Sequence, residues 1–256
     1  MMIYLTGDTH GEQNVFLVNP LSNGFDLSDE RCSFDDWIIA PSFSRFSSED
    51  ILIVCGDFGY LWTGLSAEEV YLDALSKKLP FTLAFLDGNH ENFPLIESHL
   101  KTSWKGGQIH YIRNNIYHLI RGEIYVVDGL RIFTFGGAAS TDSMHRIPGV
   151  SWWPQEVPSR EEIEYARENL RQHDNHVDFI LTHTAPVEIA RRYQKSNYKR
   201  CYSDRSFTDF LEEISLSVEH RAWIHGHLHV NAVINHPKMG LFQCLYDNII
   251  CVNELL

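Results

Sequence analysis

The chain has 256 residues, of which 44% are apolar and 21% charged, a balance that is typical of a globular protein and excludes wholesale disorder. Its 34 acidic and 21 basic residues give a formal net charge of −13, so we expect no binding of long duplex nucleic acid, which relies on Lys and Arg to neutralise phosphates. No segment approaches the ~20 uninterrupted apolar residues of a membrane span, and no membrane association is expected.

The start of the chain and its cysteines predict a cytoplasmic protein. The first residues lack a basic segment and reach Asp8 too soon for a signal peptide. The cysteines are odd in number and form no Cys-x-x-Cys pair, and three of them lie in apolar runs that indicate buried free thiols. The five are Cys32, Cys55, Cys201, Cys244 and Cys251. A reducing compartment fits this usage.

Short apolar runs alternate with helical patterns along the chain. In chain order, strands are predicted at residues 3–5, 51–55, 81–86, 124–127, 132–135, 179–181, 222–224, 232–234 and 249–252. Helices are predicted at residues 67–79, 159–173 and 206–219, the second opening with the capping-box spacing of Ser159 and Glu162. This mixture favours an α/β fold with two sheets. No linker divides the chain, so residues 1–256 are interpreted as a single domain, with the polar stretch 12–50 as a surface insertion.

Residue types that bind metals follow five of these predicted strands. Ligand sites in α/β sheets collect at the carboxyl ends of strands, so we expect these segments to meet at one edge. Glycines flank most of them, which allows sharp turns and close approach of a ligand. The five segments are Gly7-Asp8-Thr9-His10-Gly11, Gly56-Asp57, Gly88-Asn89-His90-Glu91, Thr182-His183 and His225-Gly226-His227-Leu228-His229.

The spacing within these segments indicates two metal ions. Asp8 and His10 are two residues apart, so both side chains face one way in an extended segment, and His227 and His229 repeat the pattern. One tetrahedral ion needs about four ligands, whereas seven donors suit two ions. A set of imidazole, carboxylate and amide groups without thiolate favours Mn²⁺, Fe or catalytic Zn²⁺ over a structural zinc site. The seven are Asp8, His10, Asp57, Asn89, His183, His227 and His229.

These motifs resemble those of the calcineurin-like metallophosphoesterases, over residues 3–231. A narrower resemblance, to small bacterial metallophosphatases, is carried by residues 56–59, 87–93, 135–138 and 150–153. The resemblance implies a four-layered α/β/β/α sandwich with two mixed sheets and a dinuclear metal site at the carboxyl ends of the strands. It also implies hydrolysis of phosphomonoesters or phosphodiesters by attack of a metal-bridging hydroxide, with a small molecule, a nucleotide or a phosphopeptide as substrate.

The same resemblance implies a role for each site residue. Two divalent ions are expected, Mn most readily, with Fe or Zn as alternatives. His90 is implied to be the catalytic histidine near the leaving-group oxygen, oriented by Glu91 or another acid. The ligand sets are Asp8, His10 and His229 for the first ion, Asn89, His183 and His227 for the second, and Asp57 as the bridge.

One departure from the family pattern concerns the phosphate clamp. Many relatives have an Asp-Arg pair shortly after the Gly-Asp, whereas Asp57 is followed here by Phe58-Gly59-Tyr60. Arg146 is the candidate replacement, because a guanidinium can bind phosphate bidentately; the alternative is a solvated surface arginine. The aromatic residues Tyr60, Trp62, Trp152 and Trp153 are interpreted either as walls of the substrate groove or as core residues.

Two other functions fit the same motifs. A nuclease or cyclic-nucleotide phosphodiesterase would use the same metal site, and a non-catalytic module with this fold would bind a protein partner instead. The second is disfavoured because all seven ligand candidates and His90 are present. No sequence pattern specifies the oligomeric state.

Overall fold

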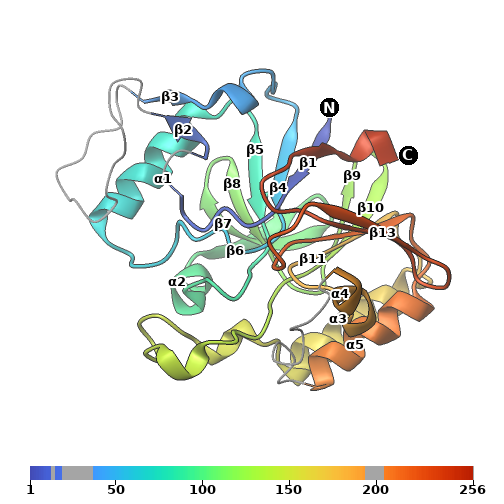
Figure 1. Ribbon diagram of the computed structural model, residues 1–256. Helices are drawn as coiled ribbons and strands as arrows, with labels where there is room; N and C mark the ends of the chain where they lie inside the picture. Colours follow the sequence, from blue (N-terminus) through green and yellow to red (C-terminus); the bar gives the residue numbers. More distant parts are fainter. Residues whose placement is uncertain (13–14, 19–36, 194–204, 256) are drawn as a thin grey trace.

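The computed structural model describes residues 1–12, 15–18, 37–193 and 205–255. Within these residues, two mixed β-sheets pack against each other between outer layers of helices (Figure 1). Helix α1 covers one sheet, and helices α3, α4 and α5 lie on the opposite side of the molecule. This arrangement is the four-layered α/β/β/α sandwich that the resemblance implies.

The first sheet has seven strands among the described residues, in the spatial order β15-β1-β4-β5-β8-β7-β6. Strands β1, β4, β5 and β8 run parallel, and the other three are antiparallel to their neighbours. In chain order they are β1 (Ile3–Thr6), β4 (Ile51–Val54), β5 (Thr82–Phe85), β6 (Leu100–Trp104), β7 (Gly107–Arg113), β8 (Ile116–Leu119) and β15 (Ile250–Cys251).

The second sheet has six described strands, in the order β13-β14-β12-β11-β10-β9. Its four central strands are parallel, and β9 and β13 are antiparallel edges. They are β9 (Ile124–Val127), β10 (Leu130–Phe135), β11 (Phe179–Thr182), β12 (Ala222–His225), β13 (Ala232–His236) and β14 (Gly240–Cys244). A small separate pair consists of β2 (Leu17–Val18) and β3 (Ile38–Ile39).

Local signals in the sequence set the helix boundaries. Helix α3 has the predicted capping box, in which Ser159 and Glu162 each accept from the other's backbone N–H. The short helix α2 begins where the Asn92 side chain accepts from the N–H of Leu95. The helices are α1 (Ser66–Lys78), α2 (Phe93–Glu97), α3 (Arg160–Gln172), α4 (Val187–Tyr193) and α5 (Arg205–Ser217), with 3₁₀ turns η1 (Pro41–Phe43), η2 (Ser143–His145), η3 (Pro154–Glu156) and η5 (Val252–Leu255).

The alternation of side chains along the strands builds three apolar layers. On β4, Ile51 and Ile53 face the other sheet, whereas Leu52 and Val54 pack toward α1. On β12, Ile224 lies between the sheets and Trp223 packs toward the helices of the second sheet. These strands are buried on both faces, which is why they are almost continuously apolar in the sequence.

The five motif-bearing strands end level with one another. In the first sheet, Thr6 at the end of β1 is in register with Val54, and Val54 with Phe85. In the second sheet, Thr182 at the end of β11 is in register with His225. Because the sheets are stacked, the loops after β1, β4, β5, β11 and β12 emerge at one edge of the sandwich.

The expected surface insertion is not wholly at the surface. In the described parts of residues 12–50, Phe16, Leu17, Trp37 and Phe43 are buried and extend the core around α1. The aromatic side chains of this stretch therefore belong to the fold. Residues 19–36, which include Cys32, lie outside the described residues, as does Cys201.

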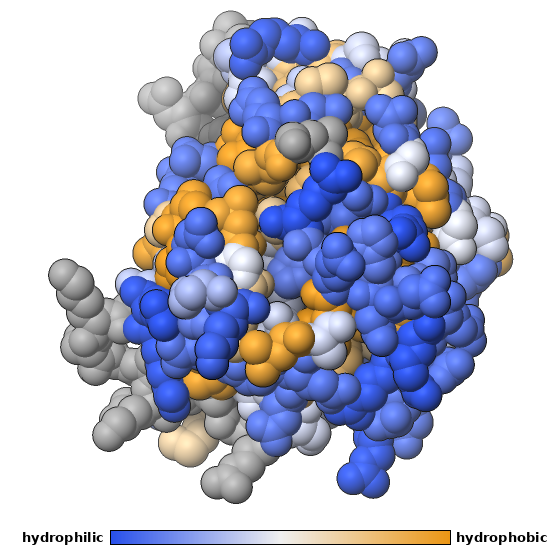
Figure 2. All heavy atoms as spheres, turned by 90° about the vertical axis from the view of Figure 1, so that its right-hand side faces the viewer, coloured by the Kyte–Doolittle hydropathy of each residue, from blue (hydrophilic) through white to orange (hydrophobic). Residues whose placement is uncertain are grey.

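The surface of the molecule is mainly polar, as expected from the composition of the chain. The face of the molecule in Figure 2 is largely hydrophilic, and its apolar patches are interrupted by hydrophilic side chains. Among the described residues, none of the helices combines the length and the apolar character needed to cross a bilayer.

Candidate metal centre

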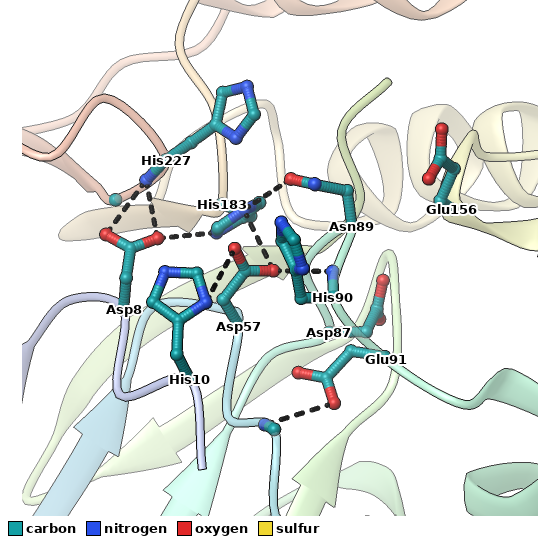
Figure 3. A network of polar contacts seen from close by, with 12 residues as sticks. Asp8, His10, Asp57, Asp87, Asn89, His90, Glu91, Glu156, His183 and His227 are labelled. Carbon is teal, nitrogen blue, oxygen red and sulfur yellow. Dashed lines mark hydrogen bonds and ion pairs between the residues drawn. The ribbon is translucent and has the colours of Figure 1, made fainter. Parts of the chain in front are cut away.

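Three buried residues from different loops form the middle of the site (Figure 3). Nδ1 of His183 lies 3.7 Å from Oδ1 of Asp8, and its Nε2 lies 3.4 Å from Oδ1 of Asp57. One ligand atom from each of the three residues lies within 4.8 Å of the others. The loops after β1, β4 and β11 therefore bring two carboxylates and an imidazole to one point.

His10 and His229 extend this cluster on the side of Asp8. Their Nε2 atoms are 3.0 Å apart, and both residues lie within 4.8 Å of a carboxylate oxygen of Asp8. Nδ1 of His10 is also 3.8 Å from Oδ2 of Asp57. The ring of Tyr246 stacks on His229 with centroids 4.6 Å apart, which fixes the orientation of that imidazole.

Asn89 and His227 extend the cluster on the side of His183. Oδ1 of Asn89 lies 3.2 Å from Nε2 of His183, and the rings of His183 and His227 have centroids 5.0 Å apart. The backbone N–H of His227 donates to both carboxylate oxygens of Asp8, at 2.9 and 3.1 Å. Five of the seven residues proposed from the sequence therefore belong to groups with metal-ligand spacing, whereas Asn89 and His227 adjoin His183 and His227 is in none of these groups.

Four of these residues hold an uncommon backbone conformation. His10, Asp57, His227 and His229 have positive φ angles of 50°, 50°, 69° and 50°, a region that residues other than glycine rarely occupy. The N–H of His10 donates to the carbonyl of Asp57 at 2.7 Å, which ties two of these turns together. Such strain persists where the surroundings enforce it and clusters at functional sites.

Glycines allow the loops to approach each other this closely. A Cβ atom at Gly88 would overlap the backbone and carboxylate of Asp57, and one at Gly56 would overlap the ring of His183. At Gly226, a Cβ would press on the carboxylate of Asp8. The glycine-rich motifs are therefore explained by packing of backbone against site residues.

The environment of the cluster shifts the pKa values of its carboxyl and imidazole groups in different directions. Burial by itself would raise the pKa of Asp57, but the facing His183 outweighs burial and holds that pKa well below its usual range. Burial likewise opposes the charged form of His183, yet Asp57 and Asp8 raise its pKa to about 9. Burial raises the pKa of Asp8 to about 6 and lowers the pKa of His10 to about 4.

His90 and Arg146 lie together beside this cluster. The N–H of His90 donates to Oδ1 of Asp57 at 2.8 Å, and its ring meets that of His10 edge-on with centroids 5.1 Å apart. Nη1 and Nη2 of Arg146 lie 3.3 and 3.2 Å from the two ring nitrogens of His90, while its Nε pairs with Asp142. The Arg146 side chain is 15% exposed, which favours a role at the site over the alternative of a solvated surface arginine.

Glu91 has a different position from the one expected. Its buried carboxylate accepts the backbone N–H of Phe58 at 2.6 Å and that of Gly59 at 3.4 Å. Burial, and next the charge of Asp57, raise the pKa of Glu91 well above its usual range. Glu91 therefore fixes the loop that follows Asp57 rather than orienting the His90 ring, because its oxygens face that loop.

The four aromatic candidates differ in burial, since Tyr60 and Trp153 are buried whereas Trp62 and Trp152 are half-exposed. The ring of Trp62 is inclined by 30° to the ring of His90 with centroids 6.5 Å apart, and Trp153 meets Trp62 edge-on at 5.1 Å. Tyr60 is 1% exposed and donates to the carbonyl of Glu12, so it belongs to the core. Trp152 is half-buried.

Two polar networks next to Asn89 were not predicted from the sequence. Arg121 donates twice to one oxygen of the buried Asp87 carboxylate, at 2.9 and 2.6 Å. Ser140 lies between Asn89 and the buried Glu156. Asp87 could have been identified from the sequence, because it belongs to the Asp-Gly-Asn-His-Glu motif. Glu156 lies in no motif.

The same region contains a large cavity that is separate from the cluster. It has a volume of about 990 Å³ and lies between α2, β7, β8 and the start of α3. Asp87, Arg121 and His118 line it, and none of the seven predicted ligands does.

The donor set fits divalent ions. Within the described residues, three overlapping groups have the necessary spacing: Asp8, His10 and His229; His10, Asp57 and His90; and Asp8, Asp57 and His183. Oxygen and imidazole nitrogen donors without sulfur suit Mn, Fe or Zn. Asp8 and Asp57 each belong to two of these groups.

Comparisons with known proteins agree with this architecture. A solved structure of a phosphopantetheinyl hydrolase from Mycobacterium tuberculosis superposes with a TM-score of 0.50 at 14% identity, covering 96% of this chain and 89% of that one, which supports the fold. A comparison with curated protein sequences gave no match. The family model for calcineurin-like phosphoesterases matches residues 1–231, and the chain therefore belongs to that metal-dependent family.

Proposed function

We propose that this protein hydrolyses phosphoesters at a dinuclear metal site. One ion would be held by Asp8, His10 and His229, and the other by Asn89, His183 and His227, with Asp57 shared. The observation that supports the proposal is the convergence of Asp and His side chains from five separate loops into groups with metal-ligand spacing. When bound, the two ions would supply Lewis acidity that polarises phosphoryl oxygens and activates water.

The pair of ions also explains how an acidic protein would bind an anionic substrate. Two divalent ions exceed the charges of Asp8 and Asp57 by two positive charges, although the whole chain carries −13. Surface charge is screened over ~8–10 Å in physiological salt. The local positive field therefore dominates for a phosphate at contact distance.

His90 and Arg146 are the proposed catalytic side chains. His90 lies beside the cluster and can hold a proton near the leaving-group oxygen, a general-acid role worth about 10²–10⁴-fold. Arg146 lies over the His90 ring at 3.2–3.3 Å, where its guanidinium can bind a phosphate oxygen. It would thereby replace the arginine that follows the Gly-Asp motif in many relatives.

The half-exposed Trp62, which packs on the buried Trp153, supports an aromatic wall next to this pair. Their rings meet edge-on, and the Trp62 ring faces His90. An aromatic wall suits a substrate with an apolar or aromatic leaving group, such as a nucleotide. We propose small phosphoesters, nucleotides or phosphopeptides as the substrate class.

A substrate panel on the Mn²⁺-loaded protein tests the proposal. It contains p-nitrophenyl phosphate, bis-p-nitrophenyl phosphate, a nucleoside monophosphate, a 2′,3′-cyclic nucleotide and a phosphopeptide. We expect metal-dependent turnover of at least one of them and loss of it in Asp57→Asn. A protein that binds two ions but turns over none would instead be the non-catalytic module, and exclusive turnover of the cyclic nucleotide would favour the phosphodiesterase.

The cysteines support a reducing compartment, which we propose is the cytoplasm. Cys55, Cys244 and Cys251 are free and buried. Burial raises the pKa of the Cys244 thiol to about 12, so this thiol is neutral and unreactive at neutral pH.

A further inference from the structure

The amide of Asn89 has to face in one direction if it binds a cation. Only the amide oxygen has a lone pair to offer, whereas the amide nitrogen is a donor. Oδ1 of Asn89 lies 3.2 Å from Nε2 of His183, on the side of the metal cluster, and Nδ2 donates to Oγ of Ser140 at 3.2 Å. Something must therefore favour this orientation over the flipped one.

Ser140 and Glu156 provide that preference. The hydroxyl of Ser140 donates to Oε2 of Glu156 at 2.6 Å, and its backbone N–H donates to Oε1 at 2.7 Å. The Ser140 hydroxyl and backbone N–H both donate to the carboxyl group of Glu156, so the hydroxyl hydrogen is committed to Glu156. The lone pairs of Ser140 are then left to accept from Asn89, which turns the amide oxygen toward the cluster.

Backbone contacts hold Glu156 in place. It is 3% exposed, and its carbonyl accepts the N–H of Ala138 at 3.0 Å. Arg121 donates to the backbone carbonyl of Gln155, the residue before Glu156, at 2.8 Å. It also binds the carboxylate of Asp87. Asp87 lies two residues before Asn89, so the backbone of the Asn89 loop and its side-chain partners are fixed relative to each other.

We infer that Ser140 and Glu156 are positioning residues for the second metal ion. Glu156 sets the direction of the Ser140 hydroxyl, and Ser140 holds the Asn89 amide with its oxygen toward the ion. This inference rests on the proposed function, because it requires Asn89 to be a ligand. Outer partners that orient a ligand commonly change metal affinity by about 10–100-fold when they are removed.

Calorimetric titration of the metal-free full-length protein with Mn²⁺ tests the inference. Ser140→Ala should weaken one of two binding events by about 10–100-fold and leave the other unchanged. Ser140→Thr keeps the hydroxyl and should restore the affinity. Glu156→Gln should weaken the same event, because a glutamine amide both donates and accepts and so no longer fixes the hydroxyl. Thr141→Ala, at an exposed neighbour, is the control.

A double-mutant cycle separates positioning from a general structural role. In an Asn89→Ala background, Ser140→Ala should cause no further loss of Mn²⁺ affinity, because the two residues act through one ligand. Wild-type affinity at both sites in Ser140→Ala would overturn the inference. So would an equal loss at both sites accompanied by a lower unfolding temperature of the metal-free variant. Wild-type protein that binds fewer than two ions would instead contradict the proposed function itself.

Discussion

The guanidinium of Arg146 lies against both ring nitrogens of His90, with Nη1 3.3 Å from Nδ1 and Nη2 3.2 Å from Nε2. Burial lowers the pKa of His90, Asp57 opposes that effect, and the adjacent Arg146 adds to the lowering. The two proposed catalytic side chains are therefore coupled, and a substitution of Arg146 should change both phosphate binding and the protonation of His90.

Arg146→Ala should raise KM by about 10–100-fold, because hydrogen bonds to a charged group contribute about 1.5–3 kcal/mol. It should also shift the pH profile of kcat/KM toward higher pH, since removal of the cation raises the pKa of His90. Steady-state kinetics between pH 5 and 9 measure both effects. Arg171→Ala, at an exposed site, is the control. An unchanged KM and an unchanged profile would remove Arg146 from the substrate site.

His90→Ala should lower kcat by about 10²–10⁴-fold, the usual contribution of a general acid. Metal content should remain that of the wild type, because the seven proposed ligands are untouched. Elemental analysis of the purified variant and kcat on a model ester measure the two quantities. The exposed neighbour His145 supplies the control variant, His145→Ala. Wild-type turnover in His90→Ala would rule out this role.

Metal binding should release protons. The pKa of His183 is raised to about 9 in the metal-free protein, so this imidazole is protonated at pH 7 and must lose its proton to bind a metal. Apparent Mn²⁺ affinity should therefore increase as pH rises from 7 toward 9. Calorimetry in two buffers of different ionisation enthalpy should show release of about one proton from this group. Affinity that is independent of pH over this range would show that His183 is not a ligand.

Gly88→Ala should destabilise the protein by about 1–3 kcal/mol through overpacking and should impair metal binding. The added Cβ would overlap Asp57, including its backbone, which cannot move aside easily. Gly129 is the matched control: its φ is +78° and no atom lies within 4 Å of an added Cβ. Gly129→Ala should cost only the backbone strain, about 1–2 kcal/mol, and leave metal binding intact. Denaturant unfolding and Mn²⁺ titration of both variants measure the difference.

The sequence predicts most of the strands that position the site, because these strands are buried on both faces and read as apolar runs. It does not reveal β6, β7, β8 or β14 of the two sheets. In β6, Lys101 and Ser103 are exposed on an edge strand and give no apolar run. It also misses the helices α2 and α4, because five and seven residues are too few for a helical period to emerge.

The ligand candidates were predictable for a related reason, since all lie in segments that follow a strand and most of them neighbour a glycine. The contacts that hold these ligand candidates in place were not predictable from the sequence. Ser140 and Glu156 are 16 residues apart in irregular segments, and no local pattern connects them to Asn89. Glu91 follows the motif histidine, but its orientation toward the backbone of Phe58 depends on how two loops pack.

The number of metal ions per chain tests the central claim most directly. Metal-free protein should be reloaded with Mn²⁺, freed of excess ion and measured by elemental analysis, with Asp57→Asn in parallel. The account predicts two ions per wild-type chain and fewer than two in Asp57→Asn, because that carboxylate lies between the two groups of ligands. A wild-type chain that retains one ion or none would contradict it.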